Sequence, residues 1–159
     1  MMIDTLNQEF PTRTYGSQPA LAAGRVLLAE DDAEMRRLLA SALRNDRYEV
    51  VEAADGKDLI DQLSNSIVKG QAVDCIVTDV RMPRLSGTQA LKFIKGAGLV
   101  IPVIVITAFG DHATRIDAWL LGAAAVIDKP FEVEHLMDEI RRLGIKPGKL
   151  PPPAFPNGS

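Results

Sequence analysis

The sequence predicts an α/β fold in which five parallel strands form one sheet with helices on both faces. Short apolar segments alternate along the chain with longer segments in which apolar residues recur every three or four positions. The apolar segments are continuous runs rich in Val and Ile, which is typical of strands buried on both faces. Because right-handed crossovers join such strands, this alternation indicates a doubly wound parallel sheet.

Five segments are predicted to be strands. In chain order they are Arg25–Ala29, Tyr48–Ala53, Val73–Asp79, Ile101–Thr107 and Ala124–Ile127. The third strand ends in a carboxylate residue, and the fourth reads IPVIVIT. Such short apolar runs between turn residues are the usual pattern of buried strands.

Five helices are predicted, one after each strand. They span Asp32–Asn45, Asp55–Val68, Ser86–Lys95, Asp111–Leu121 and Glu132–Leu143. Asp55 is a favourable N-cap residue, and Gly122 is the usual residue just beyond the end of a helix. Arg141 and Arg142 suit the negative end of the last helix.

The two ends of the chain differ from the middle in composition. Residues 1–24 show no sustained period and contain Pro11 and Pro19, so we expect a flexible N-terminal arm. Residues 145–159 contain five prolines and are expected to form a tail or the stump of a linker. Residues 25–144 are then the single folded domain of this 159-residue chain.

Composition narrows the function classes. A net charge of −3 disfavours a broad nucleic-acid-binding surface, which needs an excess of Lys and Arg. Cys75 is the only cysteine, so no internal disulfide can form and a reducing compartment is expected. The longest apolar run, Leu99–Ala108, is too short to span a bilayer. We therefore expect a soluble cytoplasmic protein that binds neither membranes nor nucleic acid directly.

Polar residues that could carry chemistry follow four of the five strands, where parallel α/β sheets place their active sites. They are Glu30, Asp31, Asp32, Asp79, Thr107 and Lys129. Clustered carboxylates repel each other unless a cation neutralises them, and Mg²⁺ with oxygen ligands suits such a group. Asp79 could then act as a nucleophile toward phosphorus, with Lys129 stabilising the phosphoryl oxygens.

Each of these residues also has an ordinary structural interpretation. Asp31 and Asp32 could be N-caps of the first helix, and Asp32 is expected to be one in addition to any other role. Lys129 could be a solvated loop residue, and Thr107 a strand-end hydroxyl. Glu30 is either a third acid near the metal or a residue that only lines the rim. The functional interpretation rests on the combination.

Four stretches occur in order at the strand ends: VLLAEDD, VTDVRMPRLSG, VIVITA and AAAVIDKPF. Together they make residues 25 to about 143 resemble the receiver domain of two-component response regulators. The resemblance covers about three quarters of the chain and implies a flavodoxin-like fold with strand order 2-1-3-4-5. It also implies that Asp79 is the phosphoacceptor.

The resemblance further implies a metal site for Mg²⁺ or Mn²⁺ next to Asp79. Asp32 would bind the metal directly, and Asp31 would bind it through water or as a second carboxylate. The backbone carbonyl of Arg81 would complete the ligands supplied by the protein.

The remaining family roles concern the phosphoryl group. Lys129 would contact it, beside a cis peptide bond to Pro130. Thr107 and the backbone amide of Ala108 would bind another phosphoryl oxygen and draw their loop inward.

One position departs from the family pattern. Three residues before the lysine the family commonly has an aromatic ring that rotates inward, and here the residue is Val126. A different element must then report phosphorylation, or coupling runs through the loop after Thr107 alone. We expect Ile116 and Leu120 to face the core, which leaves Trp119 near the surface as a candidate reporter and partner contact, or as a residue that simply packs against a neighbouring helix.

As implied by the resemblance, the chain accepts a phosphoryl group from a sensor histidine kinase or a histidine phosphotransfer protein and signals to an output protein. It catalyses only its own phosphorylation and dephosphorylation, and a phosphorylation-linked homodimer is a further form its signal could take. It could be a stand-alone receiver, a module of a longer regulator or a phosphorelay intermediate.

A true phosphatase is disfavoured, because Arg81 stands where such enzymes need a second acid. A nucleotide-binding protein is disfavoured too, since no glycine-rich loop follows the first strand.

Overall fold

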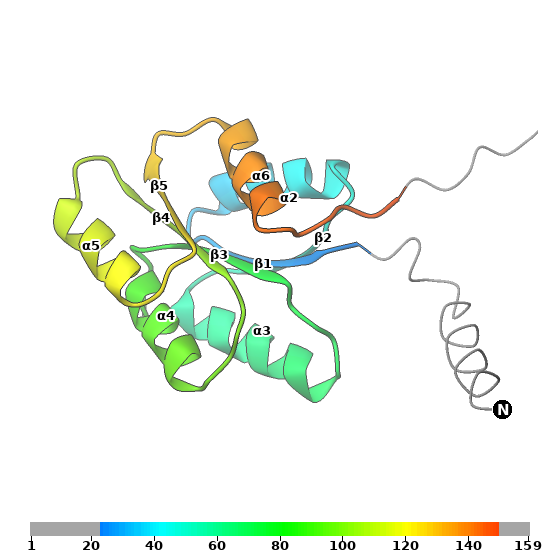
Figure 1. Cartoon of the computed structure of the whole chain (residues 1–159), viewed down its shortest axis with the longest axis horizontal. Helices are drawn as coiled ribbons and strands as arrows, with labels where there is room; N and C mark the ends of the chain where they lie inside the picture. The colour runs from blue at the N-terminus through cyan, green and yellow to red at the C-terminus, as the bar shows by residue number, and fades with distance from the viewer. Residues whose placement is uncertain (1–22, 150–159) are drawn as a thin grey trace, which may run out of the picture.

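Five parallel strands form a single sheet in the computed structural model, which describes residues 23–149. The strand order is β2-β1-β3-β4-β5, as predicted (Figure 1). The strands are β1 (Arg25–Ala29), β2 (Glu49–Ala53), β3 (Cys75–Asp79), β4 (Val103–Ala108) and β5 (Ala125–Lys129). The predicted arm and tail lie almost wholly outside the described residues.

One helix follows each strand, and the predicted ends agree to within two residues. The helices are α2 (Ala33–Asn45), α3 (Gly56–Val68), α4 (Gly87–Gly96), α5 (His112–Leu120) and α6 (Val133–Arg142). Short polar side chains begin four of them, because these side chains accept hydrogen bonds from the first free N–H groups. The capping residues are Asp32, Asp55, Ser86 and Asp111. No helix within residues 23–149 is long and apolar enough to cross a membrane.

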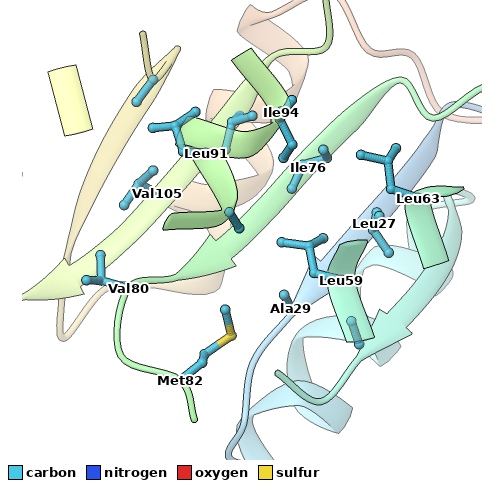
Figure 2. Packing of buried hydrophobic residues seen from close by; sticks show 14 of the residues in the cluster. Leu27, Ala29, Leu59, Leu63, Ile76, Val80, Met82, Leu91, Ile94 and Val105 are labelled. Carbon is cyan, nitrogen blue, oxygen red and sulfur yellow. The ribbon is translucent and has the colours of Figure 1, made fainter. Parts of the chain in front are cut away.

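The helices cover the sheet from both sides (Figure 1). On one face, α2 and α6 pack Leu39, Leu43 and Ile140 against the strands. On the other face, α3 and α4 contribute Leu59 and Leu91 to a second cluster, shown in Figure 2. Because both faces are covered, the three inner strands are almost completely buried, which accounts for their continuous apolar runs.

Helix α5 is less buried than the sequence suggested. The prediction that Ile116 and Leu120 face the core is wrong, since their side chains are 58% and 80% exposed. Only Ala118 of this helix is fully buried. The helix covers β4 and the edge strand β5, so less sheet lies beneath it than beneath the central helices. The helical spacing of apolar residues therefore did not show which side of α5 faces the core.

The two ends of the described chain meet at the edge of the sheet where the strands begin. The N–H of Gly24 donates to the carbonyl of Lys146 at 2.8 Å, and the Tyr48 hydroxyl donates to the carbonyl of Ile145 at 2.9 Å. Arg47 exchanges two further hydrogen bonds with Gly148. The polar residues singled out above lie at the opposite side of the sheet, where the strands end.

Candidate functional site

The candidate residues lie together at the carboxyl end of the sheet, where β1, β3, β4 and β5 end. In the parallel register, Asp79 of β3 lies beside Ile106 of β4, so Thr107 follows immediately along β4. Ala108 in turn lies beside Lys129 at the end of β5. Residues from distant parts of the sequence therefore share one site, as the topology predicts.

Three carboxylates gather at this edge. Glu30, Asp31 and Asp79 each offer one oxygen atom, and these three oxygens lie within 4.8 Å of one another. Glu30 and Asp79 are buried, whereas Asp31 is exposed to solvent. Hard oxygen donors at such short separations are suited to a divalent cation such as Mg²⁺.

Lys129 reaches into this group from β5. Its ammonium group forms an ion pair with Asp79 and lies 3.4 Å from Oε2 of Glu30. Burial alone would lower the pKa of Lys129, but the hydrogen bond and negative charge of Asp79, with those of Glu30, raise it above its ordinary value. The ammonium group is therefore charged at the site. The peptide bond to Pro130 is cis, as expected.

Thr107 contributes a hydroxyl group that is unsatisfied. The residue is 1% exposed, and its Oγ1 has no hydrogen-bond partner among the residues that the structure describes. A buried hydroxyl without a partner costs free energy, so it is a group that gains from an acceptor placed beside it. An anionic oxygen bound next to Asp79 would be such an acceptor.

A family model for the response regulator receiver domain matches residues 26–141. The chain belongs to this family. Receiver domains are the signalling modules of two-component systems. They act with histidine kinases or phosphotransfer proteins and with output domains, and they bind Mg²⁺ through acidic residues.

Curated relatives agree with this assignment of the receiver domain. The response regulator MprA of Mycobacterium tuberculosis is 32% identical over 119 residues, which is 75% of this chain and 50% of that protein. The transcriptional regulatory protein FixJ of Bradyrhizobium diazoefficiens is 34% identical over 113 residues, which is 71% of this chain and 53% of that protein. The chain thus spans about half the length of these relatives.

Solved structures match the receiver fold directly. The N-terminal domain of an uncharacterised protein from Wolinella succinogenes superposes with a TM-score of 0.69 at 34% identity, covering 77% of this chain and 94% of that one. A response regulator from Chloroflexus aurantiacus gives 0.70 at 27% identity, covering 77% and 98%. The flavodoxin-like fold inferred from sequence is therefore confirmed.

The receiver site does not include Asp32 among its clustered acids. Its Oδ1 accepts hydrogen bonds from the N–H groups of Glu34 at 2.9 Å and Met35 at 3.2 Å, so this carboxylate caps α2. The acid that joins Asp31 and Asp79 is Glu30, the first residue after β1. Only Oδ1 takes part in this cap, so the direct metal role expected for Asp32 stays a prediction beside its role as a cap. The sequence indicated the role of Glu30 in the cluster through its position, since the residue directly after a strand lies nearest the strand end.

Glu30 is held in an unusual state for a carboxyl group. Burial raises its pKa from 4.5 to about 7, and the hydrogen bond and negative charge of Asp79 act in the same direction. The backbone N–H of Asp32 and the ammonium of Lys129 oppose this rise. Glu30 therefore keeps its proton to a higher pH than a free carboxyl group does, despite the ammonium group of Lys129 nearby.

Val126, which stands where the family commonly has an aromatic residue, lies on β5. Val126 is partly buried and packs against the cluster beneath α3, α4 and α5. Trp119 is 48% exposed on α5, in agreement with the surface position expected for it. Beside Thr107 in the sheet lies Asp128, whose Oδ1 accepts a 2.8 Å hydrogen bond from Arg115 of α5. This ion pair connects the end of β5 to the helix that carries Trp119.

Proposed function

We propose that Asp79 accepts a phosphoryl group from a phosphohistidine of a sensor kinase or phosphotransfer protein. The ion pair between Lys129 and Asp79 at the carboxyl edge of the sheet carries this proposal. An oxygen of the Asp79 carboxylate would form a bond to phosphorus as the bond from phosphorus to the imidazole nitrogen breaks. The products are an aspartyl phosphate and a free histidine that takes up a proton.

Asp31, Asp32 and Asp79 are the residues proposed to hold Mg²⁺. Glu30 lies beside them, and the backbone carbonyl of Arg81 is a further oxygen ligand. The donor set fits the ion, since the side-chain donors are carboxylate oxygens, and those of Glu30, Asp31 and Asp79 lie close to one another. When bound, Mg²⁺ neutralises charge on the phosphoryl oxygens. It would also offset the mutual repulsion of the three carboxylates.

Two residues of the chain are proposed to bind the transferred group itself. The Lys129 ammonium would turn from the Asp79 carboxylate to a phosphoryl oxygen, which keeps its charge paired. The unpartnered Thr107 hydroxyl would donate to a second oxygen, and the backbone N–H of Ala108 would act with it. The chain would release the phosphoryl group only by hydrolysis of this aspartyl phosphate or by transfer onward.

The test is phosphorylation by a small phosphodonor such as acetyl phosphate, followed by intact-mass measurement. We expect one added phosphoryl group in the presence of Mg²⁺ and none in excess EDTA. Asp79→Asn should abolish the addition, whereas Asp61→Asn should retain it, because it removes an exposed carboxylate of α3 that pairs with Lys57. Phosphorylation of Asp79→Asn to the wild-type extent would refute the assignment.

The phosphorylated chain is proposed to signal through protein contacts, either alone or as a module of a longer regulator. The exposed apolar side chains of α5, Ile116, Trp119 and Leu120, support a contact face there. A homodimer formed on phosphorylation is one form this contact could take. Size measurement with and without a phosphoryl mimic tests it: the mimic should increase the size of the wild type and not of Leu120→Glu.

A further inference from the structure

The loop between β3 and α4 carries the residues just after the phosphoacceptor, and it lies directly against the start of α3. The N–H of Arg81 in this loop donates to Oδ1 of Asp79 at 3.0 Å. The loop therefore presents its backbone to the reacting carboxylate. This short stretch belongs to neither a helix nor a strand. Its shape depends on local hydrogen bonds, such as that from the Gly87 N–H to the Val80 carbonyl at 2.8 Å, and on contacts with neighbouring elements.

Arg84 connects this loop to α3 by an ion pair. Its Nε donates to Oδ2 of Asp55 at 2.8 Å, and its Nη2 lies 2.6 Å from the same oxygen. The Asp55 side chain is 10% exposed. Its other oxygen, Oδ1, accepts the N–H of Asp58 at 2.8 Å and so caps α3. A single carboxylate thus holds both the helix and the loop.

The backbone at Arg84 has a conformation that residues other than glycine rarely adopt. Its φ angle is +67°, in the left-handed region that favours glycine. Strain of this kind persists where the surroundings impose it and is concentrated at functional sites. Here the surroundings are the buried Asp55 carboxylate and the neighbouring residue Leu85.

Two further contacts fix the same loop. Gly56, the first residue of α3, lies so close to Leu85 that a Cβ atom there would overlap the Leu85 carbonyl. Met82 is 9% exposed and points from the loop into the core cluster that includes Leu59 of α3 (Figure 2). The start of α3 therefore meets the loop through an ion pair and a backbone contact, and Met82 shares a core cluster with Leu59 of the same helix.

We infer that Asp55 and Arg84 are positioning residues for the phosphorylation site, although neither touches the reacting atoms. They hold the β3–α4 loop so that the Arg81 backbone stays against Asp79 and remains available to the cation. This inference rests on the proposed function. The hydrogen bond from Asp58, supported by Arg84, holds the pKa of Asp55 below its ordinary value despite partial burial, so Asp55 is charged when it pairs with Arg84.

The chain offers well-matched variants to test this role. Asp55→Asn keeps a good cap for α3 and removes the charge that Arg84 needs. Arg84→Gly removes the guanidinium at a φ angle that glycine adopts freely. Asp61→Asn is the control, since Asp61 is half-exposed on the same helix and pairs with Lys57. It removes the same charge at a distance from the loop.

The affinity for Mn²⁺, measured by isothermal titration calorimetry on the whole chain, is the readout. We expect Asp55→Asn and Arg84→Gly each to weaken binding about 10-fold, as loss of an outer partner of a metal ligand commonly does. The double variant should bind about as weakly as either single variant, because both break one interaction. Arg84→Lys should restore part of the affinity, and Asp61→Asn should match wild type.

The outcomes separate this inference from the proposed function. Asp79→Asn must itself weaken Mn²⁺ binding; if it does not, or if the wild type binds no Mn²⁺, the proposed site and this inference both fail. If Asp79→Asn behaves as expected while Asp55→Asn and Arg84→Gly bind like wild type, only the positioning role is overturned. Urea unfolding without metal completes the test. A lower midpoint with unchanged affinity identifies a purely structural ion pair and also overturns the inference.

Discussion

The ammonium group of Lys129 at the end of β5 forms an ion pair with the carboxylate of Asp79 at the end of β3. The same nitrogen lies 3.4 Å from Oε2 of Glu30, a residue 99 positions away in the sequence. In the described structure, Lys129 thus supplies the positive charge that faces two buried carboxylates. Its removal should affect cation binding and phosphoryl transfer in opposite directions.

Lys129→Gln is expected to bind Mg²⁺ more tightly than wild type, because a nearby ammonium group repels the cation. Phosphorylation by acetyl phosphate should nevertheless slow by about 100-fold, the usual cost of losing one group that stabilises transition-state charge. Calorimetry and intact-mass time courses measure the two effects. The control is Lys57→Gln, which removes an exposed lysine of α3. Weaker Mg²⁺ binding by Lys129→Gln would contradict the prediction.

Thr107→Val is expected to stabilise the unphosphorylated protein by about 1 kcal/mol, because the buried hydroxyl that it removes has no partner in the described structure. Thr78→Val is the matched control: its buried hydroxyl donates to the carbonyl of Asp79 at 3.0 Å, and its loss should destabilise by a similar amount. Urea unfolding measures both. If Thr107→Val is as destabilising as Thr78→Val, the hydroxyl is already satisfied.

Glu30 should make the stability of the metal-free protein depend on pH. Its pKa is about 7 in the folded protein and ordinarily 4.5. Between these values the folded state binds a proton that the unfolded chain has released, so stability falls as pH rises through this window and levels off above it. Glu30→Gln, which cannot titrate, should remove most of this slope. The measurement is the urea midpoint from pH 4.5 to 8 in EDTA; parallel curves for the two proteins would contradict it.

Trp119 is expected to report the phosphorylated state through the ion pair between Arg115 and Asp128. Asp128 lies beside Thr107 in the sheet, so a movement of Thr107 should be transmitted to α5 through the ion pair of Asp128 with Arg115. Trp119 fluorescence should change when Mg²⁺ and beryllofluoride are added. The change should be smaller in Asp128→Asn and absent in Asp79→Asn. An equal response in Asp128→Asn would show that α5 is coupled by another route.

Cys75 should be inert toward thiol reagents in the folded protein. Burial in the middle of the sheet raises the pKa of its thiol to about 12, so the reactive thiolate is scarce at neutral pH. Reaction with a coloured disulfide reagent should begin only at urea concentrations that unfold the chain. Rapid reaction without urea would mean that β3 opens locally.

The order of the elements and the residues at the strand ends could be predicted because both depend on local features. Continuous apolar runs indicated the buried strands, and Asp55 indicated a helix start, because its side chain caps a nearby N–H group of α3. Parallel topology then required Asp79, Thr107 and Lys129 to share an edge. Each of these inferences involves only short-range chemistry or a general rule of chain connection.

Other features depended on which surfaces meet in three dimensions. Asp31 and Asp32 are adjacent in sequence, yet Asp31 has an oxygen close to those of Glu30 and Asp79, while Oδ1 of Asp32 caps α2. Ile116 and Leu120 have a helical spacing, but exposure depends on how much sheet lies under α5.

Asp79 is thus a residue whose place at the edge of the sheet the sequence alone determined, through an apolar strand that ends in a carboxylate. The parallel topology brought Thr107 and Lys129 to the same edge, and only the tertiary structure decided which contacts are made there. Lys129 reaches it from β5, Glu30 joins it from β1, and the loop after it is held by Arg84 against Asp55. These contacts join segments far apart in the chain, and packing rather than local preference selects them.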